Sequence, residues 1–340
     1  MSDKTGHLIL LTGASGFVAA HILESLLRHG YDVRGTVRSE ATADKVRKTH
    51  SHLLEGTQSR LTFAIVPDVA SPGAFNDAVK DVDGVIHTAS PFAVEVEDNE
   101  RDLLQPAIKG TTEIIQAVHT YAPQVKRIVI TSSFASILDT SLGDRPGYTY
   151  TEADWNPISY DEAKTADGPT AYCASKNFAE RAAWDFVEEK NPNFTLATIC
   201  PPMVYGPLQD DASIAHLNTS SADIYRLMNG TSKEPGHTGF PAFADVRDVA
   251  EAHVKAYEHP NSSRYLTTGG NFQYRDVCEI IKRVLPAYAS KVPDPDATER
   301  VETFGVDNGH ASRELGIGFR GLEECIGDAV RSLVALEERG

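Results

Sequence analysis

The amino-acid sequence predicts an α/β protein with a doubly wound parallel sheet and a smaller C-terminal α/β lobe. Over the first 200 of the 340 residues, short apolar runs alternate with helical patterns, which is typical of βαβ units and a parallel sheet. After Pro201 this alternation stops, and a polar, Gly-rich stretch follows over residues 209–241. We therefore expect a sheet domain over residues 1–200 and a discontinuous lobe over 201–340, with some of its segments returning to the sheet domain.

The expected strands are apolar on both faces, as in a sheet that helices cover from both sides. They lie at residues 8–12, 31–37, 61–66, 84–88, 127–131 and 195–200, with a further short strand at 264–268. Helices are expected at 17–29, 103–121 and 171–189. Asp245 is expected to cap another helix, and the acidic run 95–100 is interpreted as a solvated loop.

Composition limits the possible partners and the compartment. The 32 Lys and Arg residues stand against 48 Asp and Glu residues, a formal net charge of -16, which argues against nucleic acid because its affinity rests on Lys and Arg. No apolar run reaches the ~18 residues that a membrane-spanning helix needs, so no membrane partner is expected. The four cysteines form no C-x-x-C pair, which indicates reduced thiols in a cytoplasmic protein and no metal site.

A Gly-rich turn, Thr12-Gly-Ala-Ser-Gly-Phe-Val-Ala19, follows the first expected strand directly and opens the first expected helix. Gly13 allows the tight turn, Gly16 lets a pyrophosphate approach the backbone, and Ala19 lets the helix pack close to the sheet. The N–H groups and dipole at a helix start then bind the phosphates. A plain strand-to-helix turn is the alternative, but the place in a βαβ series favours a dinucleotide site. Its expected residues are Gly13, Ala14, Ser15, Gly16, Phe17 and Val18.

The residue after the second expected strand indicates which dinucleotide binds. In NAD sites this residue is an Asp or Glu, about 20 residues beyond the Gly-rich turn, and it hydrogen-bonds the adenosine ribose. Here the position holds Arg38, and the first carboxylate is Glu40. A guanidinium can pair with a 2′-phosphate, and Lys45 could add a second cation. We therefore expect NADPH or NADP+ as the cofactor.

Tyr172 and Lys176 form a Y-x-x-x-K pattern whose spacing places both side chains on one face of the helix expected at 171–189. A phenol, with a pKa of about 10, is a poor acid–base group at neutral pH, and a nearby ammonium favours its ionised form. The strand at 127–131 ends in Thr131-Ser-Ser133, at the sheet edge where open α/β sheets bind ligands. There Ser133 would hold a substrate carbonyl oxygen while Tyr172 protonates it.

Together these motifs resemble the extended short-chain dehydrogenases/reductases, and within them the fungal carbonyl and methylglyoxal reductases, related to plant dihydroflavonol and cinnamoyl-CoA reductases. The resemblance covers nearly the whole chain. The segments that carry it are 33–38, 67–69, 87–91, 126–133, 172–176, 201–207, 216–220 and 245–250. It implies a Rossmann-type fold and a catalytic triad of Ser133, Tyr172 and Lys176, with Lys176 also binding the nicotinamide ribose.

The resemblance also implies further cofactor contacts. Asp68 and Val69 would contact the adenine, and Thr88 and Ala89 would lie along the cofactor. The residues implied near the nicotinamide or its phosphates are Pro201, Val204 and Ser220.

The substrate pocket is expected between the sheet edge and the C-terminal lobe. Residues that follow a sheet-edge or lobe-joining motif are candidates to line it, and these are Phe92, Phe134, Met203, Tyr205 and Phe243. An aromatic pocket without an obvious fixed cation suits neutral carbonyl compounds better than carboxylates.

The expected reaction is therefore NADPH-dependent reduction of an aldehyde or ketone to an alcohol, in a monomer or a homodimer. Two alternatives remain open. A nucleotide-sugar epimerase or dehydratase would share the fold and the triad but would keep and cycle its cofactor. A non-catalytic NADP sensor on the same fold is disfavoured by the intact pair of Tyr172 and Lys176.

Overall fold

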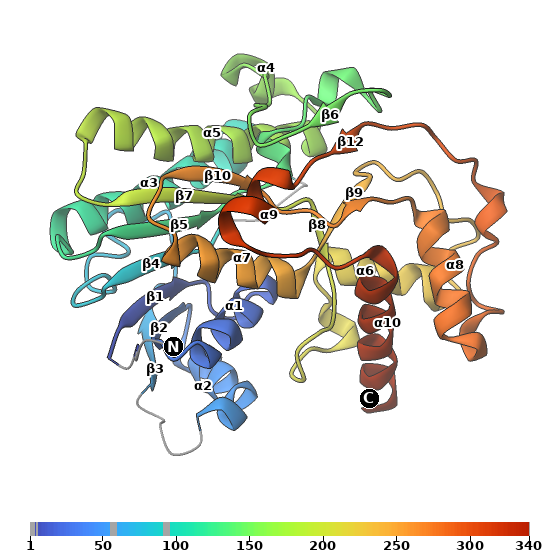
Figure 1. Cartoon of the computed structure of the whole chain (residues 1–340), viewed down its shortest axis with the longest axis horizontal. Coiled ribbons are helices and arrows are strands. Elements are labelled where there is room, and N and C mark those ends of the chain that lie inside the picture. The colour runs from blue at the N-terminus through green and yellow to red at the C-terminus, as the bar shows by residue number, and fades with distance from the viewer. Residues whose placement is uncertain (1–3, 5, 55–59, 91–95, 340) are drawn as a thin grey trace.

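The computed structural model describes residue 4 and residues 6–54, 60–90 and 96–339. In this part of the chain seven strands form the main sheet, and every neighbouring pair is parallel. The strands are β1 (Leu8–Thr12), β2 (Asp32–Val37), β3 (Leu61–Ile65), β4 (Gly84–His87), β5 (Arg127–Thr131), β7 (Thr195–Cys200) and β10 (Ser263–Leu266). Their order in the sheet is β10-β7-β5-β4-β1-β2-β3 (Figure 1).

This order confirms the predicted fold class. The chain builds outward from β1 to β3, returns to β4 on the other side of β1, and continues to β10. Open α/β sheets bind ligands at such a reversal, beyond the carboxyl ends of the strands, which here is the crevice between β1 and β4. The six strands expected in residues 1–200 are all present, and each boundary lies within one residue of its expected place.

Helices cover both faces of the main sheet (Figure 1). The described helices are α1 (Phe17–Arg28), α2 (Glu40–Thr49), α3 (Gln105–Tyr121), α4 (Tyr160–Thr165), α5 (Gly168–Lys190), α6 (Thr219–Met228), α7 (Val246–Glu258), α8 (Tyr274–Val284), α9 (Gly309–Leu315) and α10 (Leu322–Arg339). Short helical turns are η1 (Ser51–Leu53), η3 (Glu100–Leu104), η4 (Phe134–Ser136), η5 (Thr140–Leu142), η6 (Ile214–His216), η7 (Pro286–Tyr288) and η8 (Pro295–Ala297). Asp245 caps α7 by accepting a hydrogen bond from the Arg247 N–H, as expected (2.9 Å).

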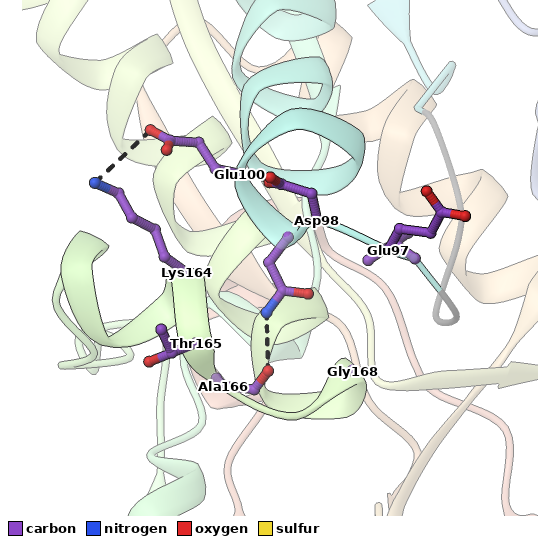
Figure 2. Close-up of a pocket in the computed structure, with 9 residues that line it drawn as sticks. Glu97, Asp98, Glu100, Lys164, Thr165, Ala166 and Gly168 are labelled. Atoms are coloured by element: carbon purple, nitrogen blue, oxygen red, sulfur yellow. Dashed lines mark hydrogen bonds and ion pairs between the residues drawn. The ribbon is translucent and has the colours of Figure 1, made fainter.

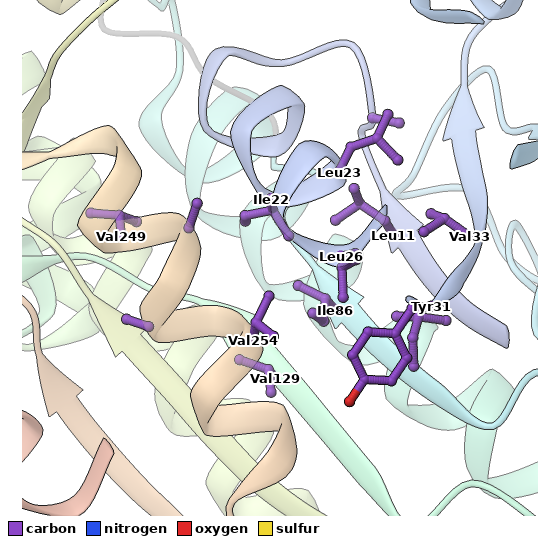
Figure 3. Close-up of a cluster of buried hydrophobic side chains, with 14 of the residues drawn as sticks. Leu11, Ile22, Leu23, Leu26, Tyr31, Val33, Ile86, Val129, Val249 and Val254 are labelled. Carbon is purple, nitrogen blue, oxygen red and sulfur yellow. The ribbon is translucent and has the colours of Figure 1, made fainter. Parts of the chain in front are cut away.

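The core alternates along each strand because successive side chains point to opposite faces. Ile9 and Leu11 pack into one cluster with α1, α2 and α7, while Leu10 packs into a second cluster with α3 and α5. Figure 3 shows the first cluster, in which strand residues such as Val33 and Val129 lie under α1 and α7. Two-sided burial explains why the central strands β1, β4, β5 and β7 carry apolar side chains on both faces.

The C-terminal half contributes both to the main sheet and to a separate lobe. Strand β10 extends the sheet beside β7, and α7 packs next to α1. The lobe contains a small sheet of β8 (Met203–Tyr205), β9 (Ala242–Asp245) and β11 (Gly270–Asn271), whose core includes residues of α6, α8 and α10. A further pair joins β6 (Thr149–Tyr150) to β12 (Gly305–Val306).

The stretch 209–241 contains α6, a helix that its composition did not predict. No helix among the described residues is both long and apolar enough to cross a membrane.

Tyr257 of α7 fixes that helix to the start of β4. Its ring lies so close to Gly84 that a Cβ at this position would overlap the ring atoms. The Tyr257 hydroxyl also lies 2.7 Å from Nε2 of His7, just before β1. Glycine at position 84 therefore allows α7 to pack directly on the sheet backbone.

We expect Gly84→Ala to destabilise the protein by about 1–3 kcal/mol, the usual cost of overpacking a core. Gly318→Ala is the matched control, because no atom lies within 4 Å of a Cβ at Gly318. It should leave stability unchanged or raise it by about 0.4–1 kcal/mol through the unfolded state. Denaturant unfolding of both variants tests this, and equal midpoints would refute the packing argument.

Candidate active site

The Gly-rich turn lies at the carboxyl end of β1 and is held by β2. The N–H groups of Gly13 and Ala14 donate to the side-chain and main-chain oxygens of Thr36, both at 3.0 Å. Gly13 has a φ of +67°, and a Cβ there would lie 3.1 Å from the Cα of Ala89. Both the backbone conformation and this close approach require glycine at position 13.

Helix α1 begins after Gly16 without a side-chain cap from any described residue, and its first turn holds no acid. The N–H groups of a first helical turn have no partners within the helix, and the helix dipole favours an anion there. The turn therefore has the open backbone donors that a pyrophosphate needs.

The hydroxyl of Thr12 joins the loops that follow β1 and β4. It accepts the N–H groups of Thr88 and Ala89, each at 3.0 Å, so its own proton goes to Nδ1 of His87 at 2.9 Å. Burial lowers the pKa of His87 to about 3, so the imidazole is neutral and serves as a packed hydrogen-bond partner. The two loops that border the crevice are thus fixed to each other.

Helix α5 brings Tyr172 and Lys176 to this crevice. It starts after Asp167, whose side chain accepts the Thr170 N–H at 2.8 Å. The Lys176 ammonium donates to the Ser90 hydroxyl at 2.7 Å and lies 5.6 Å from the centre of the Tyr172 ring. Because Ser90 directly follows Ala89, the helix that carries both predicted groups meets the Gly-rich turn through a single short loop.

Burial sets the protonation of this pair. It lowers the pKa of Lys176 to about 8 and raises the pKa of Tyr172 above its ordinary value. We expected the ammonium to favour the phenolate, but in this structure burial raises the pKa of the Tyr172 phenol instead. Tyr172 therefore holds its proton at neutral pH, which is the form that a proton donor needs.

Ser133 and Ser132 have different surroundings. The Ser133 hydroxyl is partly exposed and accepts the Ala135 N–H at 3.1 Å, which leaves its own proton for another acceptor. The Ser132 hydroxyl is buried and donates to the Glu180 carboxylate at 2.6 Å. Helix α5 packs against η4, the turn that Ser133 caps. This favours Ser133 over Ser132 as the group that meets a substrate.

A cavity of about 340 Å³ lies beside the Gly-rich turn. It is lined by the turn, by Lys45 of α2, and by the segment 208–218 that leads to α6. The Lys45 ammonium lies 3.3 Å from the Asp211 carboxylate of this segment. Asn218, at the end of the segment, donates to the Ser220 hydroxyl at 2.8 Å. The structure thus brings Lys45 to the Gly-rich turn, with Ser220 just beyond the cavity.

The other cofactor-contact candidates lie in a strand or in the segment that follows one. Arg38 follows β2 directly and is exposed. Asp68 follows β3, where the Ala70 N–H and the Ser71 hydroxyl lower the pKa of its carboxyl group. Its neighbour Val69 packs against the second core cluster. The Pro201 carbonyl accepts the Phe134 N–H at 2.9 Å, and Val204 is the middle residue of β8.

Three of the expected pocket residues are packed inside the protein. Phe134, Tyr205 and Phe243 are at most 1% exposed and belong to hydrophobic clusters. They therefore face packed neighbours rather than an open cavity, because they lie where the lobe core meets the sheet edge. Met203 is only partly buried against the lobe cluster, and Phe92 lies outside the described residues.

A second cavity, of about 910 Å³, lies between η3 and the start of α5 (Figure 2). Its polar lining includes Glu100, which pairs with Lys164 at 3.9 Å, and Asn99, which donates to the Ala166 carbonyl at 2.8 Å. Of the acidic run expected as a solvated loop, residues 96–98 are non-helical and residues 99–100 begin a helical segment, while residue 95 lies outside the described residues. In the described ranges no group of three or more His, Cys, Asp and Glu side chains could hold a metal ion.

Two residues that hold this site together, Ser90 and Glu180, were not predicted from the sequence. Ser90 binds Lys176. The sequence feature that indicates Ser90 is its position directly after the predicted contact residue Ala89. Glu180 binds Ser132 and Ser136, in the turn that contains Ser133. The sequence feature that indicates Glu180 is its spacing of four residues from Lys176, which places both on one helix face.

Comparison with known proteins places this chain among relatives of the expected kind. Residues 9–267 match the NAD dependent epimerase/dehydratase family. Ketoreductase azaE from Aspergillus niger is 40% identical over 336 residues, which cover 96% of this chain and 97% of that protein. The NADPH-dependent methylglyoxal reductase GRE2 from Saccharomyces cerevisiae is 34% identical over 345 residues, 97% of this chain and 99% of that protein.

Solved structures agree with this assignment. Yeast methylglyoxal/isovaleraldehyde reductase Gre2 complexed with NADPH matches with a TM-score of 0.89 and 33% identity, over 98% of this chain and 100% of that one. A UDP-glucose-4-epimerase from Stenotrophomonas maltophila, at 17% identity and a TM-score of 0.74 over 98% of this chain and 100% of that one, shares the fold. The resemblance to fungal carbonyl reductases is confirmed, and the chain belongs to the NAD dependent epimerase/dehydratase family.

Proposed function

We propose that this protein is an NADPH-dependent reductase that converts aldehydes or ketones to alcohols, with Ser133, Tyr172 and Lys176 as its catalytic residues. The observation that carries the proposal is the bond from Lys176 to Ser90, which holds the Tyr–Lys pair beside the Gly-rich turn. The relatives named as a ketoreductase and a methylglyoxal reductase support the same reaction class.

The residues around the crevice fit NADPH. The open N–H groups at the start of α1 suit its pyrophosphate, and the exposed Arg38 guanidinium suits its 2′-phosphate. Lys45 is a second candidate cation, although its ammonium already pairs with Asp211. When bound, the cofactor supplies the hydride for the carbonyl carbon.

Ser133, Tyr172 and Lys176 each have one role in the rest of the reaction. Ser133 donates its hydroxyl proton in a hydrogen bond to the carbonyl oxygen and orients the substrate. Tyr172, which burial keeps protonated, gives its phenolic proton to the same oxygen as negative charge develops there. The Lys176 ammonium, near the Tyr172 ring, stabilises the phenolate that remains.

Nucleotide-sugar epimerisation or dehydration is the second candidate, because the matching family and the shared epimerase fold include it. Such an enzyme regenerates its cofactor in each cycle. An NADPH-oxidation screen over small aldehydes, diketones, aryl ketones and β-ketoesters separates the two functions. A reductase consumes one NADPH for each alcohol formed, whereas no consumption with any carbonyl compound would refute the reductase proposal.

We expect Tyr172→Phe to lower kcat by about 100-fold or more, since general-acid catalysis contributes roughly that much. The dissociation constant for NADPH, measured by fluorescence titration, should change by less than about twofold because the phenolic proton acts in the chemical step. Tyr121→Phe is the control, since Tyr121 is 48% exposed at the end of α3. Retained turnover in Tyr172→Phe would remove this residue from the mechanism.

Arg38→Ser should raise the KM for NADPH roughly tenfold or more and leave the KM for NADH unchanged, because only NADPH carries the 2′-phosphate that a guanidinium binds. Lys48→Ala removes an exposed cation of α2 and should change neither constant. Steady-state kinetics with both cofactors tests this. A wild-type enzyme that uses NADH as well as NADPH would contradict the assignment of Arg38.

The pH dependence should follow Lys176. Its lowered pKa, about 8, means that the ammonium loses its proton well below the ordinary value for lysine. We therefore expect kcat/KM for the carbonyl substrate to fall as the pH rises through about 8, because the neutral amine no longer stabilises the phenolate. A pH–rate profile that stays flat to pH 10 would contradict this role for Lys176.

A further inference from the structure

Glu180 is a buried carboxylate on the helix that carries the catalytic pair. It lies four residues after Lys176 and eight after Tyr172, a spacing that puts all three on one face of α5. Its side chain is 1% exposed. Its partners are Trp184 of α5 itself, whose indole N–H donates to Oε1 at 3.2 Å, and side chains of β7, β10 and the turn that follows β5.

Three hydroxyl groups surround the Glu180 carboxylate. The Ser132 and Thr198 hydroxyls donate to it at 2.6 and 2.7 Å, and the Ser136 hydroxyl lies 2.5 Å from Oε2. Ser136 Oγ is also 2.7 Å from the carbonyl oxygen of Ser133. The residues on both sides of Ser133 are therefore held by one carboxylate.

Arg264 of β10 balances this charge. Its Nε and Nη2 donate to the two carboxylate oxygens of Glu180 at 2.7 and 3.2 Å. The guanidinium is itself fixed, because Nη1 donates to the Asp154 carbonyl at 2.8 Å and the group lies 3.4 Å from the centre of the Trp155 ring. The pair joins the edge of the main sheet to the catalytic helix.

The ionised form of Glu180 is the form that fits these partners. Burial alone would raise its pKa, but the Arg264 guanidinium and the hydrogen bonds from Ser132 and Ser136 outweigh burial and lower the pKa. A carboxylate only accepts hydrogen bonds, so it can receive all of these donors, whereas a glutamine would turn an NH₂ group toward some of them.

We propose that Glu180 is a positioning residue that sets the place of Ser133 relative to Tyr172 and Lys176. The inference rests on the proposed function, which assigns the chemistry to these three residues. Tyr172, Lys176 and Glu180 share one rigid helix, so the bonds from Glu180 to Ser132 and Ser136 fix the distance between that helix and the serine turn. Catalytic geometry is sensitive to such a distance, since a displacement of about 1 Å can cost about 100-fold in rate.

The first test compares kcat in folded protein. Glu180→Gln should lower kcat roughly tenfold or more, counted per NADPH-binding site, with the dissociation constant for NADPH changed by less than about twofold. Arg127→Met is the matched control. Arg127 is also buried, lies at the opposite end of β5 from Ser133, and bonds to the Ala256 carbonyl at 2.9 Å. This control should lower the Tm and leave kcat unchanged.

A double variant separates positioning from stability. Removing one partner of a buried ion pair destabilises a protein, whereas replacing both with apolar groups often does not. Glu180→Leu with Arg264→Met should therefore recover much of the Tm lost in Glu180→Gln but none of the kcat. If kcat recovers together with the Tm, Glu180 is only structural and the proposal is overturned.

A second readout does not depend on turnover. Amide hydrogen exchange in residues 132–138 should be faster in Glu180→Gln than in the wild type, and unchanged in Arg127→Met. Ser132→Ala, which keeps the ion pair, should show the same faster exchange if Glu180→Gln does not fold. Unchanged exchange in both Glu180→Gln and Ser132→Ala would refute the positioning role.

If the wild type oxidises no NADPH with any carbonyl, the reductase proposal fails, while the exchange result still decides whether Glu180 holds the serine turn.

Discussion

The hydroxyl of Thr12 is the contact on which the rest of the site depends. It binds the backbone after β4 from the end of β1, and so fixes the two loops at the point where the strand order reverses. Gly13 can then approach Ala89, and Ser90 is placed where Lys176 reaches it. A single side chain thereby links the Gly-rich turn to the helix that carries Tyr172 and Lys176.

Charge is arranged locally in this acidic protein. The net charge of -16 disfavours large polyanions, yet the proposed cofactor is itself multiply charged. Open backbone N–H groups at the start of α1 and the exposed Arg38 would supply the attraction without changing the overall balance. Lys45 differs from Arg38, because Asp211 already neutralises part of its charge across the cavity.

Burial decides the protonation of Tyr172 and Lys176. Exclusion of water raises the pKa of the Tyr172 phenol and lowers the pKa of Lys176, so each group moves toward its neutral form. Glu180, on the same helix face, stays ionised because Arg264 and the serine hydroxyls outweigh the same effect. One helix thus carries a neutral phenol and an ionised, paired carboxylate a few residues apart. The two groups differ in charge because Glu180 has a guanidinium and hydroxyl donors around it, whereas burial dominates at Tyr172.

The sequence by itself determined the six strands of the main sheet that lie in residues 1–200, the Gly-rich turn and the shared helix face of Tyr172 and Lys176. These features are local. The alternation of strand and helix patterns, the spacing of residues along a helix and the need for glycine at a positive φ all depend on residues that are close together in the chain. Only the tertiary structure decided that β10 joins the sheet, that Phe134, Tyr205 and Phe243 are packed in the core, and that Ser132 binds Glu180 while Ser133 does not. It also decided the direction of the Tyr172 pKa shift, because desolvation depends on atoms brought in from distant segments, and no spacing along the chain records them.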